Sequence, residues 1–338
     1  MAINRIGIEN FTVFDKFEMD FCNGINVFIG ENGTGKTHLL KLLYALCEWK
    51  AGVSTEEADP TIAQKIQRCF QYVPFKDLAS RNQISEQNKD TIKLFSSVNN
   101  REKSYQIWDF SKNGQYECQS SGEQDYLPSL FIPAKDMLTH GGLEKDYIDR
   151  HLPLDITLID ILNKAGVSAL KNLPDDKLSI LTRISDIIGG KIIYKNDRYY
   201  TERPDGTIID FAAEAEGYKK LGLIYRLIET GRLEKGSVLI WDEPESNLNP
   251  NLVPLLVDIL LAFEKVGIQM FFATHDYFFS KFLEVRKQAN TQIMYHALYK
   301  RNHQVLKESQ RDFELLENNS IITQSISLFK EEIKKVME

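Results

Sequence analysis

Short apolar runs alternate with turns at the start of the chain. The runs INRIGIENF and FEMDF are typical of two antiparallel strands, and INVFIG predicts a buried strand over Ile25–Ile29. A glycine-rich loop follows at 30–35, and leucines then recur at helical spacing from Lys36 to about Trp49. The chain is therefore expected to begin with a strand, a glycine-rich loop and a helix, after a β-hairpin.

The central part of the chain changes pattern several times. Residues 51–90 are polar and irregular, and short helices are expected there. Alternation over 91–119 predicts further strands, with a hairpin turn at Asn113-Gly114. A short apolar strand at Ser129–Ile132 precedes a helical region over 136–190, whose amphipathic segments end at glycines. This region is expected to be an insertion between two parts of one core.

Strands and helices alternate in the C-terminal part of the chain. Two strands flank a Pro-Asp-Gly turn, and a helix is expected from about Glu214 to Thr230. The apolar runs VLIWDE and QMFFATH predict strands, and each is followed by a predicted helix, PNLVPLLVDILLAFEKV and YFFSKFLEVRK. This alternation is typical of parallel βαβ units.

The last segment predicts an amphipathic helix. Its apolar residues recur at spacings of four, three, four and three: Ile322, Ile326, Phe329, Ile333 and Val336. We expect the apolar face to pack on the core, and the alternative is that it binds a partner.

Composition and charge limit the possible classes of protein. The chain has 338 residues, of which 43% are hydrophobic and 26% charged, as in a globular protein of about two domains or one large domain with an insertion. The net charge is −7, from 41 Lys+Arg and 48 Asp+Glu. Nucleic-acid-binding proteins usually carry a basic excess, so any contact with nucleic acid would need a local patch or a partner.

Cysteine usage and hydropathy indicate the cellular setting. Cys22, Cys47, Cys69 and Cys118 are widely spaced, which predicts free thiols rather than a disulfide framework or a metal site. The N-terminus lacks the apolar core of a signal peptide. The longest apolar stretch, Leu252–Phe263, is shorter than the roughly 20 residues of a membrane-spanning helix. We therefore expect a cytoplasmic protein with no membrane partner.

The glycine-rich loop carries the first chemical motif. Gly30–Thr37 fits the pattern GxxxxGK[ST] in full, and it lies between a predicted strand and a predicted helix. Glycines let backbone N–H groups converge on phosphate oxygens, and the helix N-terminus adds the positive end of its dipole. Lys36 is expected to reach the β- and γ-phosphates, and the Thr37 hydroxyl to ligate Mg²⁺. The predicted ligands are ATP and Mg²⁺, with contacts from Asn32, Gly33, Thr34, Gly35, Lys36, Thr37 and His38.

Polar residues at the ends of two later strands carry the second motif. Asp242 is expected to hold Mg²⁺, and Glu243 beside it to orient the attacking water. His275 ends the next predicted strand, so it should point at the same crevice beyond the carboxyl ends of the sheet and sense the γ-phosphate. The predicted catalytic residues are therefore Glu243 and His275, and the predicted metal ligands are Thr37 and Asp242.

Taken together, these motifs resemble the ATP-binding-cassette (ABC) ATPases, in particular their soluble Rad50, SMC, RecF and OLD-like branch. The N-terminal block up to the phosphate loop, the segment VLIWDEPESNLNP and the segment FFATHD are similar to that branch. The resemblance makes Ser246–Pro250 the D-loop and His275 the switch histidine. It implies an α/β P-loop NTPase fold of ABC-ATPase type, with a mixed central sheet, an antiparallel β-subdomain and a helical insertion.

The resemblance also implies a homodimer or a higher oligomer. In this class each ATP is sandwiched between the phosphate loop of one chain and the signature helix of the other. The resemblance therefore implies that Gly217, Ser246 and Asn247 complete a nucleotide site on the partner chain.

The signature motif departs from the family pattern LSGGQ. Gly217 matches its second glycine, but Ala215 stands at the serine position and Glu216 at the first glycine. A carboxylate facing a triphosphate is unfavourable unless it turns away or pairs with a lysine. Lys219 or Lys220 could supply the missing contact, and the alternative is a solvated helix face.

The motifs divide the chain into four predicted segments. Residues 1–135 form an N-terminal lobe with the phosphate-binding loop and a β-subdomain, and 136–210 a helical and β insertion. Residues 211–300 form a C-terminal lobe with the signature helix and the strand-end motifs, and 301–338 a tail with the amphipathic helix. A glutamine of the family's Q-loop is not evident, and by order Lys135 takes its place.

Several larger architectures are disfavoured by what the chain lacks. No long heptad insertion lies between 50 and 210, and no acidic cluster of a nuclease domain follows the last predicted strand. The chain resembles short AAA-labelled ATPases of prokaryotic anti-phage and toxin-type defence modules, which implies control of an effector, a nuclease or toxin encoded nearby. The alternatives are a RecF-like ATP-gated DNA-binding repair protein and a weakly hydrolysing nucleotide-dependent scaffold. A P-loop kinase or GTPase is disfavoured, because neither carries the series from Asp242 through the D-loop to His275.

Overall fold

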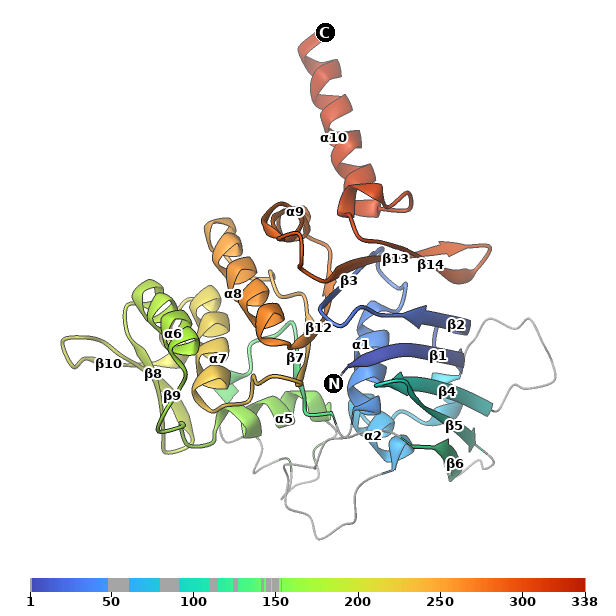
Figure 1. The fold of residues 1–338 in the computed structure, drawn as a ribbon, viewed down its shortest axis with the longest axis horizontal. Helices are drawn as coiled ribbons and strands as arrows, with labels where there is room; N and C mark the ends of the chain where they lie inside the picture. The colour runs from blue at the N-terminus through green and yellow to red at the C-terminus, as the bar shows by residue number, and fades with distance from the viewer. Residues whose placement is uncertain are drawn as a thin grey trace.

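The computed structural model describes most of the chain, and its elements are labelled in Figure 1. The described residues are 2–47, 61–79, 91–109, 115–123, 127–140, 143, 147, 152 and 154–337. No helix among them is both long enough and apolar enough to cross a membrane.

Most of the elements up to α9 follow the order expected from the hydrophobic pattern. The strands are β1 (Ile3–Phe11), β2 (Phe14–Asp20), β3 (Ile25–Gly30), β4 (Thr91–Val98), β5 (Arg101–Asp109), β6 (Tyr116–Gly122), β7 (Ser129–Ile132), β8 (Lys191–Lys195), β9 (Arg198–Glu202), β10 (Ile208–Asp210), β11 (Val238–Asp242), β12 (Gln269–Thr274), β13 (Ile293–Arg301) and β14 (Gln304–Gln310). The α-helices are α1 (Lys36–Leu46), α2 (Ile62–Cys69), α3 (Phe75–Leu78), α5 (Ile156–Ala165), α6 (Asp175–Ile188), α7 (Glu216–Glu229), α8 (Val253–Val266), α9 (Tyr277–Arg286) and α10 (Ser320–Met337).

A six-stranded mixed sheet forms the centre of the molecule. Its strand order is β14-β13-β3-β12-β11-β7, and every neighbouring pair is parallel except β13 with β14. β12 lies between β3 and β11, with Thr274 paired to Ile29 and Ala273 paired to Asp242. The carboxyl ends of these three strands therefore meet at one edge of the sheet.

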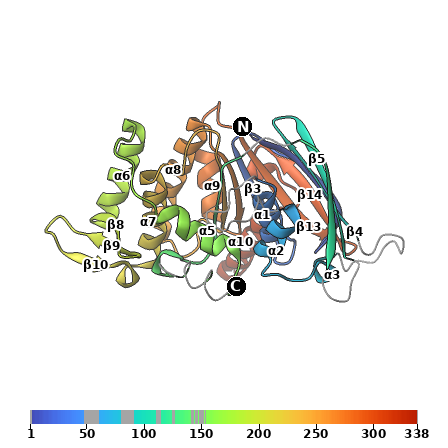
Figure 2. The ribbon, with the colours of Figure 1, turned by 90° about the horizontal axis from the view of Figure 1, so that it is seen from below.

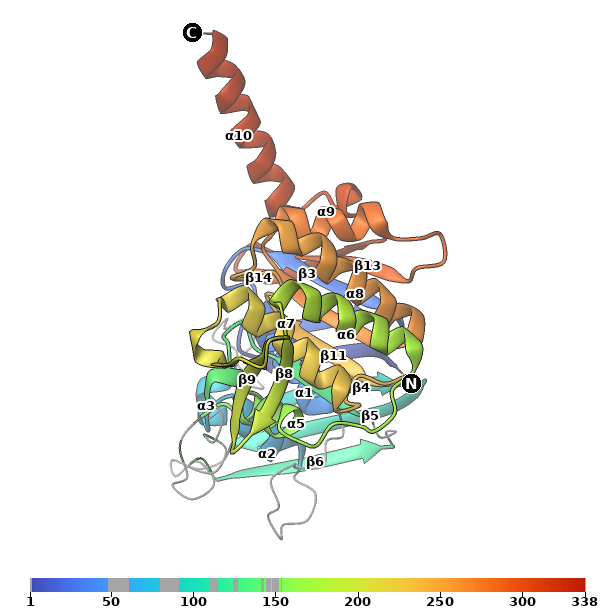
Figure 3. The ribbon, with the colours of Figure 1, turned by 90° about the vertical axis from the view of Figure 1, so that its left-hand side faces the viewer.

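Within this sheet β3 and β12 are buried on both faces, so these two strands are apolar at nearly every position. On one face Phe28, Ile240 and Phe271 pack with residues of α1 and of the antiparallel sheet. On the other face Trp241 and Phe272 pack with residues of α7, α8 and α9. Figure 2 shows α1 between the two sheets, and Figure 3 shows α6, α7 and α8 on the opposite side.

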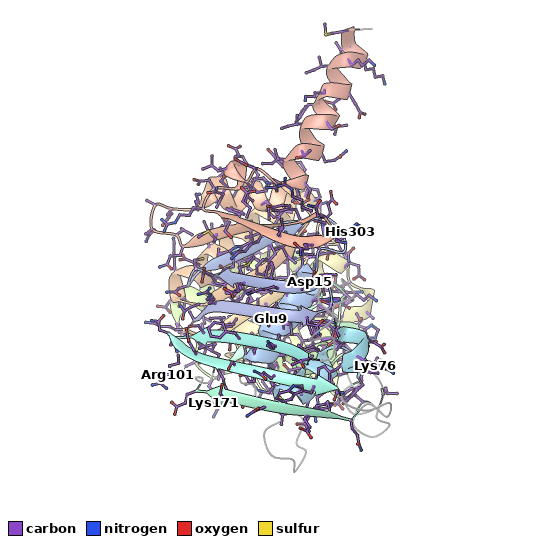
Figure 4. All side chains as sticks on the ribbon, turned by 90° about the vertical axis from the view of Figure 1, so that its right-hand side faces the viewer. Glu9, Asp15, Lys76, Arg101, Lys171 and His303 are labelled. Carbon is purple, nitrogen blue, oxygen red and sulfur yellow. The ribbon has the colours of Figure 1, made fainter. Side chains whose placement is uncertain are left out.

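The second sheet is antiparallel and has the order β2-β1-β4-β5-β6. Its inner face carries core residues such as Ile6 and Leu94, whereas Figure 4 looks onto a polar outer face with Glu9 and Arg101. Glu9 pairs there with Lys93 at 3.2 Å. β5 and β6 pair as the hairpin prediction requires, although Asn113-Gly114 itself lies outside the described residues. The end of the predicted first helix, near Trp49, also lies outside them.

A helical lobe with the small sheet β10-β9-β8 occupies the position of the predicted insertion. It is tied to α1 by polar contacts: the Lys41 ammonium lies 2.5 Å from Asp155, and the Tyr44 hydroxyl donates to Asp160. The central sheet combines strands from the predicted first, third and fourth segments, and the boundaries of those segments stay a prediction.

The hairpin of β13 and β14 is absent from the sequence interpretation. β14 alternates buried or half-buried with exposed positions and contains charged residues, so it lacks a strong apolar run. β13 completes the sheet by pairing with β3, from Ile293 opposite Ile25 to Leu298 opposite Gly30. Long-range pairing, rather than a local pattern, forms this part of the sheet.

The expectation that the last helix packs on the core is wrong for most of its length. α10 forms, but beyond its first turn it projects from the body of the molecule (Figure 1). Phe329 is 63% exposed and Val336 86% exposed, and only Ile321 and Ile322 pack against the core. The side chain of buried Asn319 accepts hydrogen bonds from the first backbone N–H groups of the helix, which fixes the direction in which it leaves the core.

Candidate nucleotide-binding site

The loop between β3 and α1 depends on glycine at Gly35. This residue precedes α1 in a left-handed conformation, with a φ of 91°. A Cβ atom at this position would lie only 2.6 Å from the Phe14 ring, so the loop and β2 pack too closely for a side chain. Thr34 is buried and donates a hydrogen bond to the Glu31 carbonyl at 2.8 Å. These contacts hold the loop around the N-terminus of α1, where anions are favoured.

Lys36 is turned into this loop. Its ammonium donates hydrogen bonds to the carbonyl oxygens of Gly30 at 2.7 Å and of Glu31 at 3.1 Å. The residue is 6% exposed, and burial lowers the pKa of its ammonium to about 8, although the Asp242 and Glu243 carboxylates favour the charged form. The loop therefore places the Lys36 ammonium beside the N-terminus of α1, and the positive charge of this ammonium is only partly compensated.

Thr37 and Asp242 are brought into direct contact. The Thr37 hydroxyl donates a hydrogen bond to Asp242 Oδ2 at 2.9 Å. Burial raises the pKa of Asp242 and Glu243 adds to that effect, whereas the Thr37 hydrogen bond and Lys36 oppose it. A hydroxyl and a carboxylate are hard oxygen donors of the kind that Mg²⁺ prefers, so the two residues fit the predicted metal site.

Glu243 and His275 lie on neighbouring strand ends. Glu243 has a left-handed backbone with φ of 49°, and its N–H donates to the Ala273 carbonyl at 2.9 Å. Such a conformation is uncommon and strained for a residue with a side chain. Burial lowers the pKa of His275, and Lys36 lowers it further, whereas Glu243 raises it.

One cavity of about 230 Å³ is lined by most of the predicted site residues. His38 lines it and packs edge-on against the Phe70 ring, and burial lowers the pKa of its imidazole. The lining residues are Val13, Asn32, Gly33, Gly35, Lys36, Thr37, His38, Asp242, Glu243, Ala273 and His275. Residues from the ends of β3, β11 and β12 therefore face one volume.

Gly217, Ser246 and Asn247 lie apart from this cavity. Gly217 begins α7 and lies against the D-loop, where an added Cβ atom would be 3.4 Å from the Asn247 carbonyl oxygen. Lys135 is exposed in the turn after β7 and does not line the cavity. The structure thus separates the predicted residues into those that line the cavity and a second group at the start of α7, whereas Thr34 is buried within the loop and does not line the cavity.

The two lysines after Gly217 are both engaged within the chain. Lys219 pairs with Glu216 at 2.7 Å, which is the compensation that a carboxylate at the signature position requires. Lys220 donates to the carbonyl oxygens of Glu243 at 2.9 Å and of Ser246 at 2.6 Å. Lys220 therefore does not lie on a solvated helix face, and its contact with a phosphate stays a prediction.

The sequence interpretation missed the roles of Lys220, Glu245 and Thr274. Glu245 Oε1 accepts a hydrogen bond from the Thr274 hydroxyl at 2.6 Å, which joins the segment after β11 to the end of β12. One signal for Lys220 was available: it precedes Leu223 and Ile224 by three and four positions, which places it near the buried face of a helix. Nothing local marked the pairing of Glu245 with Thr274.

Short segments of this chain are similar to RecF proteins. The RecF protein of Cytophaga hutchinsonii is 44% identical over 57 residues, or 17% of this chain, and that of an Exiguobacterium strain is 36% identical over 59 residues. The matched part spans about 15% of the length of the first relative.

Solved structures share the fold. An SMC head bound to the C-terminal winged-helix domain of ScpA matches 94% of this chain and all of that chain, with a TM-score of 0.60 and 14% identity. The SMC head domain from Thermotoga maritima matches 92% of this chain and 99% of that chain, with a TM-score of 0.52 and 11% identity. The predicted fold class, an α/β P-loop NTPase of ABC-ATPase type, is therefore confirmed.

Family models cover most of the chain. An "AAA ATPase domain" model matches residues 1–127. A second model, described as "AAA domain, putative AbiEii toxin, Type IV TA system", matches residues 80–280, which is more than half of the chain. With the phosphate loop, the paired carboxylates and the strand-end histidine around one cavity, the chain belongs to this family of AAA-type ATPase domains.

Proposed function

We propose that this protein binds and hydrolyses ATP with Mg²⁺, as a dimer that closes around the nucleotide and controls an effector protein. The observation that carries the proposal is the convergence of Lys36, Thr37, Asp242, Glu243 and His275 on one cavity from three adjacent strand ends. Taken alone, neither Asp242-Glu243 nor His275 would indicate a reaction. Phosphoryl transfer requires a cation, a metal site and a water-orienting carboxylate together, and this cavity combines them.

Lys36 is proposed to bind the phosphates. Its ammonium now donates to two loop carbonyls, Gly30 and Glu31, which phosphate oxygens would replace as acceptors. Exchange of neutral carbonyls for anionic oxygens strengthens the hydrogen bonds, because both partners are then charged. The start of α1 adds backbone N–H donors.

Thr37 and Asp242 are the residues that would hold Mg²⁺. Their direct contact at 2.9 Å supports this assignment, because it brings one hydroxyl and one carboxylate oxygen to the same point. When bound, Mg²⁺ supplies neutralisation of phosphate charge.

Glu243 and His275 are proposed to act at the terminal phosphate. The Glu243 carboxylate accepts a hydrogen bond from the attacking water and orients it. His275 donates from its imidazole to the γ-phosphate. Their place on adjacent strand ends supports this division, since both side chains line the cavity beside Lys36.

The dimer is supported by the second group of residues. Gly217 and Asn247 lie together at the start of α7, away from the cavity. Asn247 is exposed there, as a residue that contacts a partner chain's nucleotide has to be, whereas Gly217 is buried against the D-loop of its own chain.

Control of an effector protein is supported by the description of the matching family. The family description names a toxin and a type IV toxin–antitoxin system, which supports a role in a toxin-type defence module. A RecF-like role in ATP-gated DNA binding is the second candidate, and the RecF similarity favours it. The net charge of −7 weighs against strong DNA binding by the isolated chain.

A turnover assay tests the core of the proposal. Phosphate release from ATP is measured with and without Mg²⁺, and the expected result is Mg²⁺-dependent turnover that Glu243→Gln abolishes. ATP-dependent association without turnover would favour the scaffold. Salt-sensitive binding of duplex DNA would favour the RecF-like role, and isolation of the protein from its host with a co-purifying nuclease or toxin would support effector control.

A further inference from the structure

A partly buried side-chain bridge joins Glu245, which immediately precedes the D-loop, to the residues around His275. Glu245 Oε1 accepts a hydrogen bond from the Thr274 hydroxyl at 2.6 Å, and Thr274 is fully buried at the end of β12. The same hydroxyl oxygen accepts a hydrogen bond from the backbone N–H of Asp276 at 3.0 Å. Thr274 and Asp276 flank His275. The Thr274 hydroxyl therefore connects Glu245 to both neighbours of His275.

The other end of the bridge is fixed to the signature helix. The Lys220 ammonium donates to the Glu243 carbonyl at 2.9 Å, to the Ser246 carbonyl at 2.6 Å and to the Ser246 hydroxyl at 2.7 Å. The acceptors lie on both sides of Glu245 in the chain. Lys220 therefore holds the backbone from which Glu245 extends, and α7, the D-loop and the end of β12 form one connected unit.

Both charged groups are withdrawn from solvent at an energetic cost. Burial lowers the pKa of Lys220 to about 8 and raises the pKa of Glu245 to about 7. The second oxygen of Glu245, Oε2, is shielded from solvent and has no hydrogen-bond partner among the described residues. Partly buried charged groups of this kind contribute little net stability, so the bridge is better explained by the geometry that it imposes.

We propose that Glu245 is a positioning residue for His275, acting through the Thr274 hydroxyl, with Lys220 fixing the D-loop end of the link on α7. The inference rests on the proposed role of His275 at the γ-phosphate. Movement of α7 or of the D-loop then changes the position of His275 directly, without passing through the phosphate loop.

Steady-state kinetics of paired variants test this link. We expect Glu245→Ala and Thr274→Val to lower kcat about tenfold or more, because small misplacements of a reacting group are costly. ADP affinity should stay within about twofold, since the phosphate loop is untouched. Glu245→Gln and Thr274→Ser keep the acceptor and the hydroxyl and should restore most of the loss. Thr182→Val, on α6, removes a threonine hydroxyl that bonds only within its own helix and serves as the control.

The decisive comparison uses a His275→Ala background. If Glu245 acts through His275, Glu245→Ala causes no further loss of kcat there, because the positioned side chain is already absent. If the two losses multiply instead, or if Glu245→Ala leaves kcat unchanged in the otherwise wild-type chain, the proposal is overturned.

Hydrogen exchange gives a readout that does not depend on turnover. Glu245→Ala should speed exchange of the backbone amides over 274–278, and Thr182→Val should not. Unchanged exchange in this segment would overturn the proposal. Absence of ATP turnover in the wild-type protein would instead contradict the proposed function, and the exchange measurement would still decide whether Glu245 positions the His275 segment.

Discussion

The Thr37 hydroxyl donates a hydrogen bond to the Asp242 carboxylate at 2.9 Å, although 205 positions separate the two residues in the chain. Thr37 lies in the first turn of α1, and Asp242 ends β11. They meet because β12 is inserted between β3 and β11 with all three strands parallel and in register. The contact unites the two residues predicted as metal ligands.

Glu243→Gln should trap an ATP-bound dimer. The amide keeps the size of the side chain but cannot orient water as a carboxylate does, so turnover should fall by about 10²–10³ while ATP binding persists. Light scattering after size exclusion, with and without Mg-ATP, measures the mass. The double variant Lys36→Ala/Glu243→Gln should remain unchanged in size. The sandwich model is wrong if Glu243→Gln has the same mass in both conditions and the wild-type protein is not already a constitutive dimer.

Lys36→Ala and His275→Ala should differ in their effect on ADP. Lys36 is proposed to act on phosphates shared by ADP and ATP, so its removal should weaken both nucleotides and abolish turnover. His275→Ala should bind ADP with nearly wild-type affinity and lose about 10²–10³ in rate. Titration calorimetry with ADP separates the two roles. Equal weakening by both variants would support a structural histidine instead.

ADP affinity should fall as pH rises above 8. In the ligand-free protein burial lowers the pKa of Lys36 to about 8, and a bound phosphate favours the protonated form. Below pH 8 the ammonium is already charged and affinity is constant. Above pH 8 binding takes up a proton, and affinity should fall by up to about tenfold per pH unit. Lys36→Arg, which stays charged, should show a much smaller slope between pH 7 and 9.5. Equal slopes would assign the effect to another group.

Gly217→Ala should weaken ATP-dependent dimerisation while leaving the folded state nearly as stable as in the wild-type protein. A Cβ atom there would lie 3.4 Å from the Asn247 oxygen and from Leu248 Cδ2, which is ordinary contact, so the free energy of unfolding should change by less than about 1 kcal/mol. ATP-dependent dimerisation and turnover should fall if Gly217 faces the partner chain's nucleotide.

Gly222→Ala on the same helix is the matched control. Its Cβ atom would lie 2.3 Å from the Phe211 ring, so it should cost about 1–3 kcal/mol of stability through overpacking. Chemical denaturation measures both variants. Normal dimerisation and turnover in Gly217→Ala would refute the proposed contact.

The parts of the site that are local in the chain can be predicted from the amino-acid pattern alone. The phosphate loop at Gly30–Thr37 is contiguous, and its conformation follows from glycines between an apolar strand and a helix. Alternating strands and helices likewise predicted the parallel sheet, because both faces of such a sheet are buried and the runs are apolar throughout. The same alternation of strands and helices predicts that Asp242 and His275 follow one another at the ends of successive strands.

Which segments meet depends instead on long-range packing. Whether Lys220 faces solvent, a phosphate or the D-loop depends on the packing of α7 against the turn after β11, and no local pattern encodes that packing. The bridge from Glu245 to Thr274 and the pairing of β13 with β3 also join segments far apart in the chain. α10 shows the converse: its apolar stripe predicts a buried face, but the cap at Asn319 directs the helix away from the core. Periodicity specifies which face of an element is apolar, whereas the contacts of that face are set by the geometry of every other element packed around it.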